Sequence, residues 1–228
     1  MVLINDPTGS SRSSIADLPV FTDCSHAVDV IFLIDSSSSV GEENFDIIRR
    51  FLSNTIQEMH IDTGHVRVSV VSFSQEVHTH FLLDRFSRKE TMLEAVLNIP
   101  YYYGTSSLRD ALREVRNNVM KKRNGDRPDA PNVLIIVTDG TPSIHTRQTE
   151  LEAQRLQEER VHVMAVGVDL QGDDEERVGQ IVTPPIVKNL ISIKGFDQLT
   201  ETKNRISSSI CQGIVTIMNK IIFVVKVL

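Results

Sequence analysis

Short apolar runs alternate with longer amphipathic segments along most of this 228-residue chain. The apolar runs predict strands at residues 30–34, 66–73, 133–138, 161–168 and 190–193. Four of these runs are continuously apolar, as expected for strands that are covered on both faces. Apolar residues at helical spacing predict helices at 45–56, 108–119, 151–160 and 196–210. This alternation predicts an α/β fold, a doubly wound and mostly parallel central sheet with helices on both faces.

The segment EVHTHFLL, residues 76–83, departs from this pattern because its polar and apolar residues alternate. It follows the strand that ends at Phe73 after a very short connection. A connection this short can form a hairpin but not a crossover. We therefore expect one antiparallel edge strand on the otherwise parallel sheet.

Composition divides the chain into three parts. Residues 1–23 are rich in Ser, Pro, Asp and Thr, a composition that predicts a linker. Residues 24–212 carry the strand and helix patterns of one domain. Residues 213–228 form an apolar tail. The tail is shorter than the roughly 20 apolar residues of a membrane span and contains Asn219, Lys220 and Lys226, which argues against a span. The first residues show no signal-peptide pattern.

Net charge and cysteine content narrow the class of protein. The formal charge is −6 and the pI about 5.6, so we expect no nucleic-acid partner. The two cysteines, Cys24 and Cys211, bracket the patterned region. Spacing alone leaves two interpretations open, a disulfide or two reduced thiols.

Three loops rich in side-chain oxygen are expected at the carboxyl ends of strands, where ligands bind in open sheets of this class. They contain the sequences DSSSS after residue 34, GTSS before the helix at 108, and TDGTPS after residue 137. In the first loop, Asp35, Ser37 and Ser39 are two residues apart and point the same way if the loop is extended. Carboxylate and hydroxyl oxygens suit a hard cation such as Mg²⁺.

Both acidic loops also have a purely structural interpretation. Ser39 and Glu42 have the spacing of a capping box for the following helix, and Asp139–Gly140 is a common turn dipeptide. However, Asp139 follows a buried strand and is placed by the topology to face Asp35. Two acids that converge on one edge favour a metal site over two unrelated turns.

Enzymatic signatures are missing from the sequence. A haloacid-dehalogenase-type phosphatase would need a second aspartate where Ser37 stands. No serine lies in a G-x-S-x-G turn, and neither of the glycine patterns of nucleotide-binding loops follows a strand. We therefore expect no catalytic residues and no enzyme.

From about Cys24 to Cys211, the chain resembles a von Willebrand factor type A domain. The resemblance is carried by three segments: DVIFLIDSSSSVG, the Gly104-Thr105-Ser106 loop before Ala111-Leu112, and VLIIVTDGTP. The resemblance implies a metal-ion-dependent adhesion site with the ligands Asp35, Ser37, Ser39, Ser106 and Asp139. Ser106 stands where the family has threonine, Thr105 is the alternative, and the second glycine of that loop is absent. Ser36 and Ser38 are expected to be spacers whose identity matters little.

The resemblance also implies a function. It suggests an extracellular adhesion module in which Mg²⁺ or Mn²⁺ accepts a carboxylate from a matrix or cell-surface protein, with collagen among the candidate ligands. The alternative is a structural module of matrix assembly that binds without metal. Members of the matrix type often join cysteines at the positions of Cys24 and Cys211, which implies a disulfide and a secreted or cell-surface location.

Overall fold

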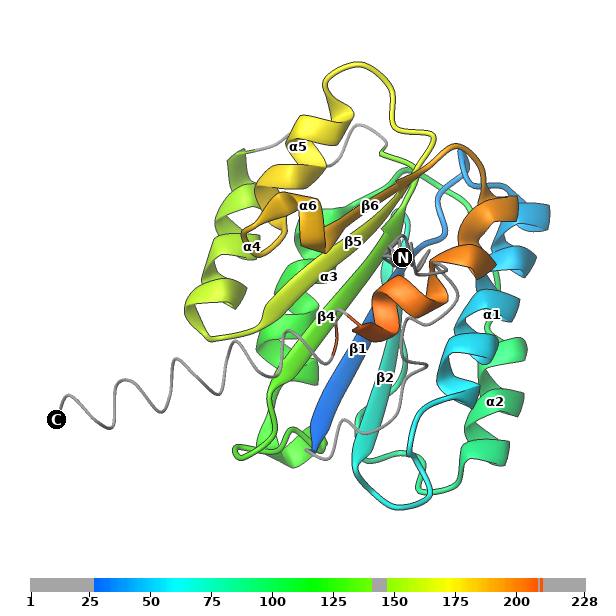
Figure 1. The fold of residues 1–228 in the computed structure, drawn as a ribbon, viewed down its shortest axis with the longest axis vertical. Helices are drawn as coiled ribbons and strands as arrows, with labels where there is room; N and C mark the ends of the chain where they lie inside the picture. The colour runs from blue at the N-terminus through cyan, green and yellow to red at the C-terminus, as the bar shows by residue number, and fades with distance from the viewer. Residues whose placement is uncertain (1–26, 141–146, 209, 211–228) are drawn as a thin grey trace, which may run out of the picture.

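The computed structural model describes residues 27–140, 147–208 and 210. A six-stranded sheet in the order β3-β2-β1-β4-β5-β6 has helices on both faces (Figure 1). The strands are β1 (Val28–Asp35), β2 (Val66–Phe73), β3 (Val77–Phe81), β4 (Asn132–Thr138), β5 (His162–Val168) and β6 (Leu190–Ile193). The helices are α1 (Glu42–Gln57), α2 (Lys89–Leu97), α3 (Leu108–Glu114), η1 (Val115–Val119), η2 (Lys122–Asn124), α4 (Arg147–Glu158), α5 (Asp174–Ile181), α6 (Ile186–Asn189) and η4 (Phe196–Thr202), followed by a helical stretch over 203–208.

The central strand β1 pairs in parallel with β2 on one side and with β4 on the other. Phe32, for example, is in register with Val70 of β2 and with Ile135 of β4. Among the strands of the described residues, only β3 is antiparallel, and it pairs with β2. The predicted fold class, including the antiparallel edge strand, is confirmed.

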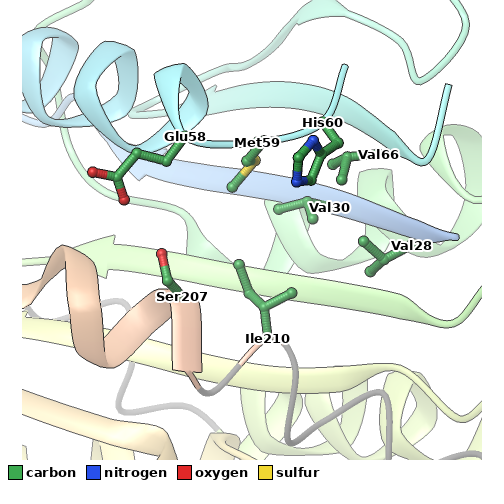
Figure 2. A pocket seen from close by; sticks show the side chains of 8 residues that line it. All are labelled: Val28, Val30, Glu58, Met59, His60, Val66, Ser207 and Ile210. Carbon is green, nitrogen blue, oxygen red and sulfur yellow. The ribbon is translucent and has the colours of Figure 1, made fainter. Parts of the chain in front are cut away.

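The two ends of the described domain meet at one apolar hollow. Val28 at the start of β1 and Ile210 both line it, together with Met59 beyond the end of α1 (Figure 2). The chain therefore enters and leaves the domain on the same side. The predicted linker, the apolar tail and both cysteines, Cys24 and Cys211, lie outside the described residues.

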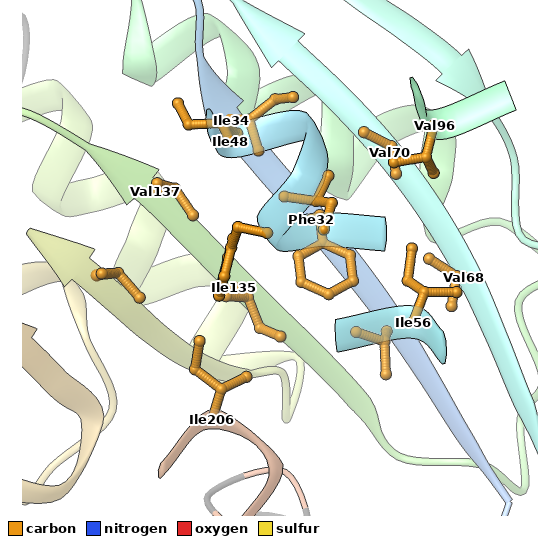
Figure 3. Close-up of a cluster of buried hydrophobic side chains, with 14 of the residues drawn as sticks. Phe32, Ile34, Ile48, Ile56, Val68, Val70, Val96, Ile135, Val137 and Ile206 are labelled. Atoms are coloured by element: carbon orange, nitrogen blue, oxygen red, sulfur yellow. The ribbon is translucent and has the colours of Figure 1, made fainter. Parts of the chain in front are cut away.

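The core has two layers because side chains of a strand alternate between the faces of the sheet. From β1, Val30, Phe32 and Ile34 pack in the cluster that includes α1, α2 and the 203–208 helix (Figure 3). Ile31 and Leu33 point to the opposite cluster, under α3, α4 and α5. Every residue of β1 is buried, which explains the continuous apolar run at residues 30–34.

Several helices differ from the sequence-based predictions. α2 and α6 were not predicted, α4 begins earlier than the predicted helix at 151–160, and η1 is a π-helix that continues α3. The helix predicted for 196–210 begins instead as the 3₁₀ helix η4. None of the helices in the described part of the chain is both long and apolar enough to cross a membrane.

Candidate metal-binding site

The carboxyl ends of β1 and β4 lie side by side because the two strands are parallel and paired as far as Ile34 and Val137. Asp35 is the last residue of β1, and Asp139 directly follows β4. The loop before α3 reaches the same edge, where Ser106 contacts Asp35. The topology thus brings together the acids and hydroxyls that the sequence nominated.

Asp35 is the centre of this cluster and is fully buried. Its Oδ1 accepts a hydrogen bond of 2.9 Å from the backbone N–H of Ser37. Its Oδ2 accepts hydrogen bonds from the hydroxyls of Thr138, at 2.9 Å, and Ser106, at 3.4 Å. Burial raises the pKa of Asp35 to about 6, and the neighbouring charge of Asp139 adds to that rise, while the hydrogen bonds from Ser37 and Thr138 oppose it.

Ser37 and Ser39 face one another, with their hydroxyl oxygens 3.1 Å apart. Ser37 is buried and Ser39 is exposed, so the pair runs from the protein interior toward solvent. The capping-box interpretation is wrong. The N-cap position of α1 is Gly41, and no side chain caps that helix end. The hydroxyl of Ser39 is directed to Ser37 instead.

Ser36 and Ser38 are more than the spacers that the sequence suggested. The Ser36 hydroxyl donates a hydrogen bond of 3.1 Å to the carbonyl of Phe73 in β2. The Ser38 hydroxyl accepts one of 3.0 Å from the N–H of Gly104, and the Ser38 N–H donates one of 2.9 Å to the Gly104 carbonyl. These two serines therefore fix the first loop to β2 and to the loop before α3.

The backbone conformation of the loop before α3 requires a glycine at position 104. Its φ of 143° is one that residues with a side chain rarely adopt, and a Cβ there would lie 3.1 Å from the Cβ of Gln75. The turn directs Ser106 to Asp35, whereas Thr105 is exposed. Of the two hydroxyls that the sequence left open, the structure places that of Ser106 in the cluster.

The carboxylate of Asp139 is the feature of the cluster that most favours a bound metal ion. Its Oδ1 is buried and has no hydrogen-bond partner among the described residues. An unpaired buried carboxylate oxygen is costly, and native proteins rarely retain one without a bound ion or water. The donor set of two carboxylates and several hydroxyls fits a hard divalent cation. Within the described ranges, no three His, Cys, Asp or Glu side chains gather as a metal site, so the hydroxyls would have to contribute.

The cluster opens onto the surface. Ser39 and Asp139 form part of the wall of a hollow of about 460 Å³, which α1 and the turn after β5 also line. Asn44, Asp169 and Lys194 also line it. A protein ligand could therefore approach the hydroxyl of Ser39 and the carboxylate of Asp139 from solvent.

Two supporting residues had no role in the sequence analysis. Thr138 holds Oδ2 of Asp35, and Tyr101 donates a hydrogen bond of 3.0 Å from its hydroxyl to the carbonyl of Ser37 while its ring packs on Phe45. The position of Thr138 next to Asp139 was a usable signal. The position of Tyr101 was not, because it depends on a contact 64 residues away along the chain.

Comparisons with known proteins identify relatives of this chain among matrix proteins. The chain is 28% identical to the collagen alpha-4(VI) chain of Mus musculus, over 86% of this chain and 8% of the collagen chain. It is 29% identical to matrilin-1 of Homo sapiens, over 82% of this chain and 37% of matrilin-1. The chain thus spans well under half the length of these relatives.

Among solved structures, proximal thread matrix protein 1 from the mussel byssus superposes with a TM-score of 0.75 at 27% identity, over 82% of this chain and 48% of that one. A second structure of the same mussel protein is described as having a zinc-occupied MIDAS motif, and it superposes equally well. Residues 29–205 match the family model of the von Willebrand factor type A domain. This chain belongs to the von Willebrand factor type A domain family.

Proposed function

We propose that this domain is an adhesion module of the extracellular matrix that binds a protein ligand through a divalent cation. Asp35, Ser37, Ser39, Ser106 and Asp139 would hold the ion, as Mg²⁺ or Mn²⁺. The observation that carries the proposal is the buried and unpaired Oδ1 of Asp139, beside a carboxylate and three hydroxyls at one edge of the sheet. Relatives from matrix proteins support the adhesive role.

The coordination of the site explains how a ligand would be recognised. The five proposed ligands would fill five positions around a cation that prefers six, so a carboxylate from a partner protein can fill the last one. Thr138 and the N–H of Ser37 hold Asp35 in place, which leaves Ser39 and Asp139 at the open side of the cluster. An aspartate or glutamate of the ligand would approach from that hollow.

We also propose that Cys24 and Cys211 form a disulfide. Val28 and Ile210, which are close to the cysteines in sequence, line the same hollow, and this proximity supports the pairing. A disulfide would place the protein in an oxidising compartment, consistent with a secreted or cell-surface location. Peptide mapping of the unreduced protein would identify the linked cysteine peptides.

The experiment that tests the function is a solid-phase binding assay with purified collagens and matrilin. Each would be assayed in Mg²⁺ and in EDTA with the wild-type domain and with Asp35→Ala. We expect saturable binding to at least one matrix protein in Mg²⁺, and its loss in EDTA and in the variant. Binding that is indifferent to EDTA and to the substitution would instead support a metal-independent assembly module.

A further inference from the structure

A second surface of the domain has the features of a peptide-binding groove. Ile186 and Val187 of α6 are 47% and 77% exposed, although most large apolar side chains in the described residues are buried. They are adjacent in sequence, in the short helix that directly precedes β6. Neighbouring exposed apolar residues of this size often mark an interaction surface, whereas an isolated one does not.

These two side chains form part of the wall of an open groove of about 340 Å³ along β6. Leu190 and Ser192 of β6 form its floor. Ile186 is held in position because its side chain packs on Gly179 of α5, where a Cβ would lie 3.2 Å from Ile186 Cδ1. No residue of this groove belongs to the metal site.

The floor of the groove is an edge of the sheet. β6 is the last strand in the sheet order and pairs with β5 alone among the described strands (Figure 1). The Ile193 carbonyl accepts a hydrogen bond from Asp169, so this residue faces β5. Because backbone groups alternate along a strand, the N–H and C=O of Ser192 face away from β5, into the groove. An edge of this kind can pair with another extended segment.

The two walls of the groove carry opposite charges. Glu175 and Glu176, at the start of α5, line one wall, and Arg205 of the 203–208 helix lines the other. The carboxylate of Glu175 accepts a hydrogen bond of 2.8 Å from the Ser192 hydroxyl, which fixes this acid beside the exposed strand edge. A basic side chain on a bound segment would therefore meet the acidic wall.

We propose that this groove binds an extended segment of a partner protein, which adds to β6 as a further strand. The segment would place an apolar side chain on Ile186 and Val187, and a lysine or arginine beside Glu175 and Glu176. A second copy of this chain fits less well. A four-residue strand and two apolar side chains offer far less than the roughly 1,200–2,000 Å² of a stable protein interface. The mode is β-strand addition, in which backbone hydrogen bonds give affinity and side-chain contacts give specificity.

The test uses blocked synthetic heptapeptides and the full chain labelled with ¹⁵N. The probe has the sequence Thr-Lys-Thr-Val-Thr-Lys-Thr, which places the valine and both lysines on the same face of an added strand. One control replaces both lysines by glutamate, and another replaces the threonine before the valine by proline, which removes a backbone donor. We expect chemical-shift changes centred on Leu190–Ile193 that saturate with the lysine peptide, and binding about tenfold weaker for both controls.

Variants of the exposed groove residues make the test specific. Val187→Asp should abolish the shifts, and the double variant Glu175→Lys, Glu176→Lys should reverse the preference toward the glutamate peptide. Asp35→Ala should bind the lysine peptide as the wild type does, so this outcome is independent of the metal site. No saturable binding, shifts centred on another element, or a preference unchanged by the charge reversal would overturn the proposal. Dimerisation through β6 in analytical ultracentrifugation would also overturn it, since a second copy would then occupy the groove.

Discussion

Thr138 donates a hydrogen bond of 2.9 Å to Oδ2 of Asp35, across 103 positions of the sequence. The contact exists because β1 and β4 are parallel neighbours whose carboxyl ends lie together. It orients the buried carboxylate that is central to the proposed metal site. Thr138 is thus a positioning residue, adjacent in sequence to the proposed ligand Asp139.

Thr138→Val should weaken Mg²⁺ or Mn²⁺ binding by about tenfold, because outer-shell partners of metal ligands typically contribute 10–100-fold to affinity. Valine keeps the shape of threonine and removes only the hydroxyl. The matched control is Thr55→Val, which removes another buried hydroxyl, one that bonds the Phe51 carbonyl within α1. Calorimetric titration of both variants checks the prediction. Equal metal affinity in the two variants would show that Thr138 does not orient Asp35.

Ser106→Ala and Thr105→Ala should differ although the two residues are neighbours. Ser106 contacts Asp35, whereas Thr105 is exposed. We expect Ser106→Ala to lower metal affinity by about tenfold and Thr105→Ala to change it by less than about twofold. The same titration measures both. A larger effect at Thr105 would move the ligand role from Ser106 to Thr105.

Arg127→Ala should destabilise the domain by about 3–5 kcal/mol, because it removes the ion-pair partner of the buried Asp29 carboxylate and keeps only the backbone N–H bond to it. Arg127 bonds Asp29 through its backbone N–H, at 2.9 Å, and through Nε, at 2.8 Å. Burial raises the pKa of Asp29 even though Arg127 opposes that rise. The free energy of unfolding in urea measures the effect.

Two further variants test that explanation. Arg67→Ala removes a single hydrogen bond from an arginine to the Gly125 carbonyl and should cost much less than Arg127→Ala. Asp29→Asn should recover part of the stability lost in Arg127→Ala, because it removes the unpaired charge. If the double variant were as unstable as the single one, packing rather than charge would explain the loss.

Stability should fall between about pH 6.5 and pH 4 because of His80. Burial, and to a smaller extent the charge of His78, lowers the pKa of His80 to about 4 from 6.5. In this window the unfolded chain binds a proton that the folded protein does not, so acidification favours unfolding. The contribution of His80 should reach roughly 3 kcal/mol at pH 4.

His80→Gln should remove this part of the pH dependence, since glutamine does not titrate and can still bond the Ser72 hydroxyl that contacts His80 Nε2 at 2.8 Å. Urea unfolding curves of both proteins at several pH values provide the comparison. The difference in stability between the wild type and His80→Gln reports the titration of His80 alone. It excludes the effect of Asp35, whose raised pKa favours the folded protein as the pH falls. Parallel pH profiles for the two proteins would contradict the assignment.

The sequence predicted the sheet well because its strands are buried on both faces. β2 and β6 have the predicted bounds, and β1 begins two residues before its prediction. The missed helices had weak signals. α2 buries only Met92 and Val96, and α6 is four residues long. Amphipathic periodicity is undetectable in elements that bury so few side chains.

The candidate ligands could be nominated from the sequence, but the residues that hold them in place could not. The spacing of Asp35, Ser37 and Ser39 and the position of Asp139 follow from local sequence. The contacts of Ser38 with Gly104, and of Tyr101 with Ser37, join residues 66 and 64 positions apart. Such pairings depend on how the loops and strands pack, and local patterns contain no information about them.

The proposed site holds one divalent cation through Asp35, Ser37, Ser39, Ser106 and Asp139. Its decisive test is calorimetric titration of Mn²⁺ into the wild-type domain and into Asp139→Asn. The control is Asp169→Asn, which changes an exposed acid on the wall of the same hollow. Asparagine tolerates the positive φ of 50° at that position.

We predict one ion per wild-type domain, an affinity in Asp139→Asn that is lower by more than about 100-fold, and an unchanged affinity in Asp169→Asn. A wild-type domain that does not bind the ion, or an Asp139→Asn variant that binds it as tightly as the control, would contradict the account.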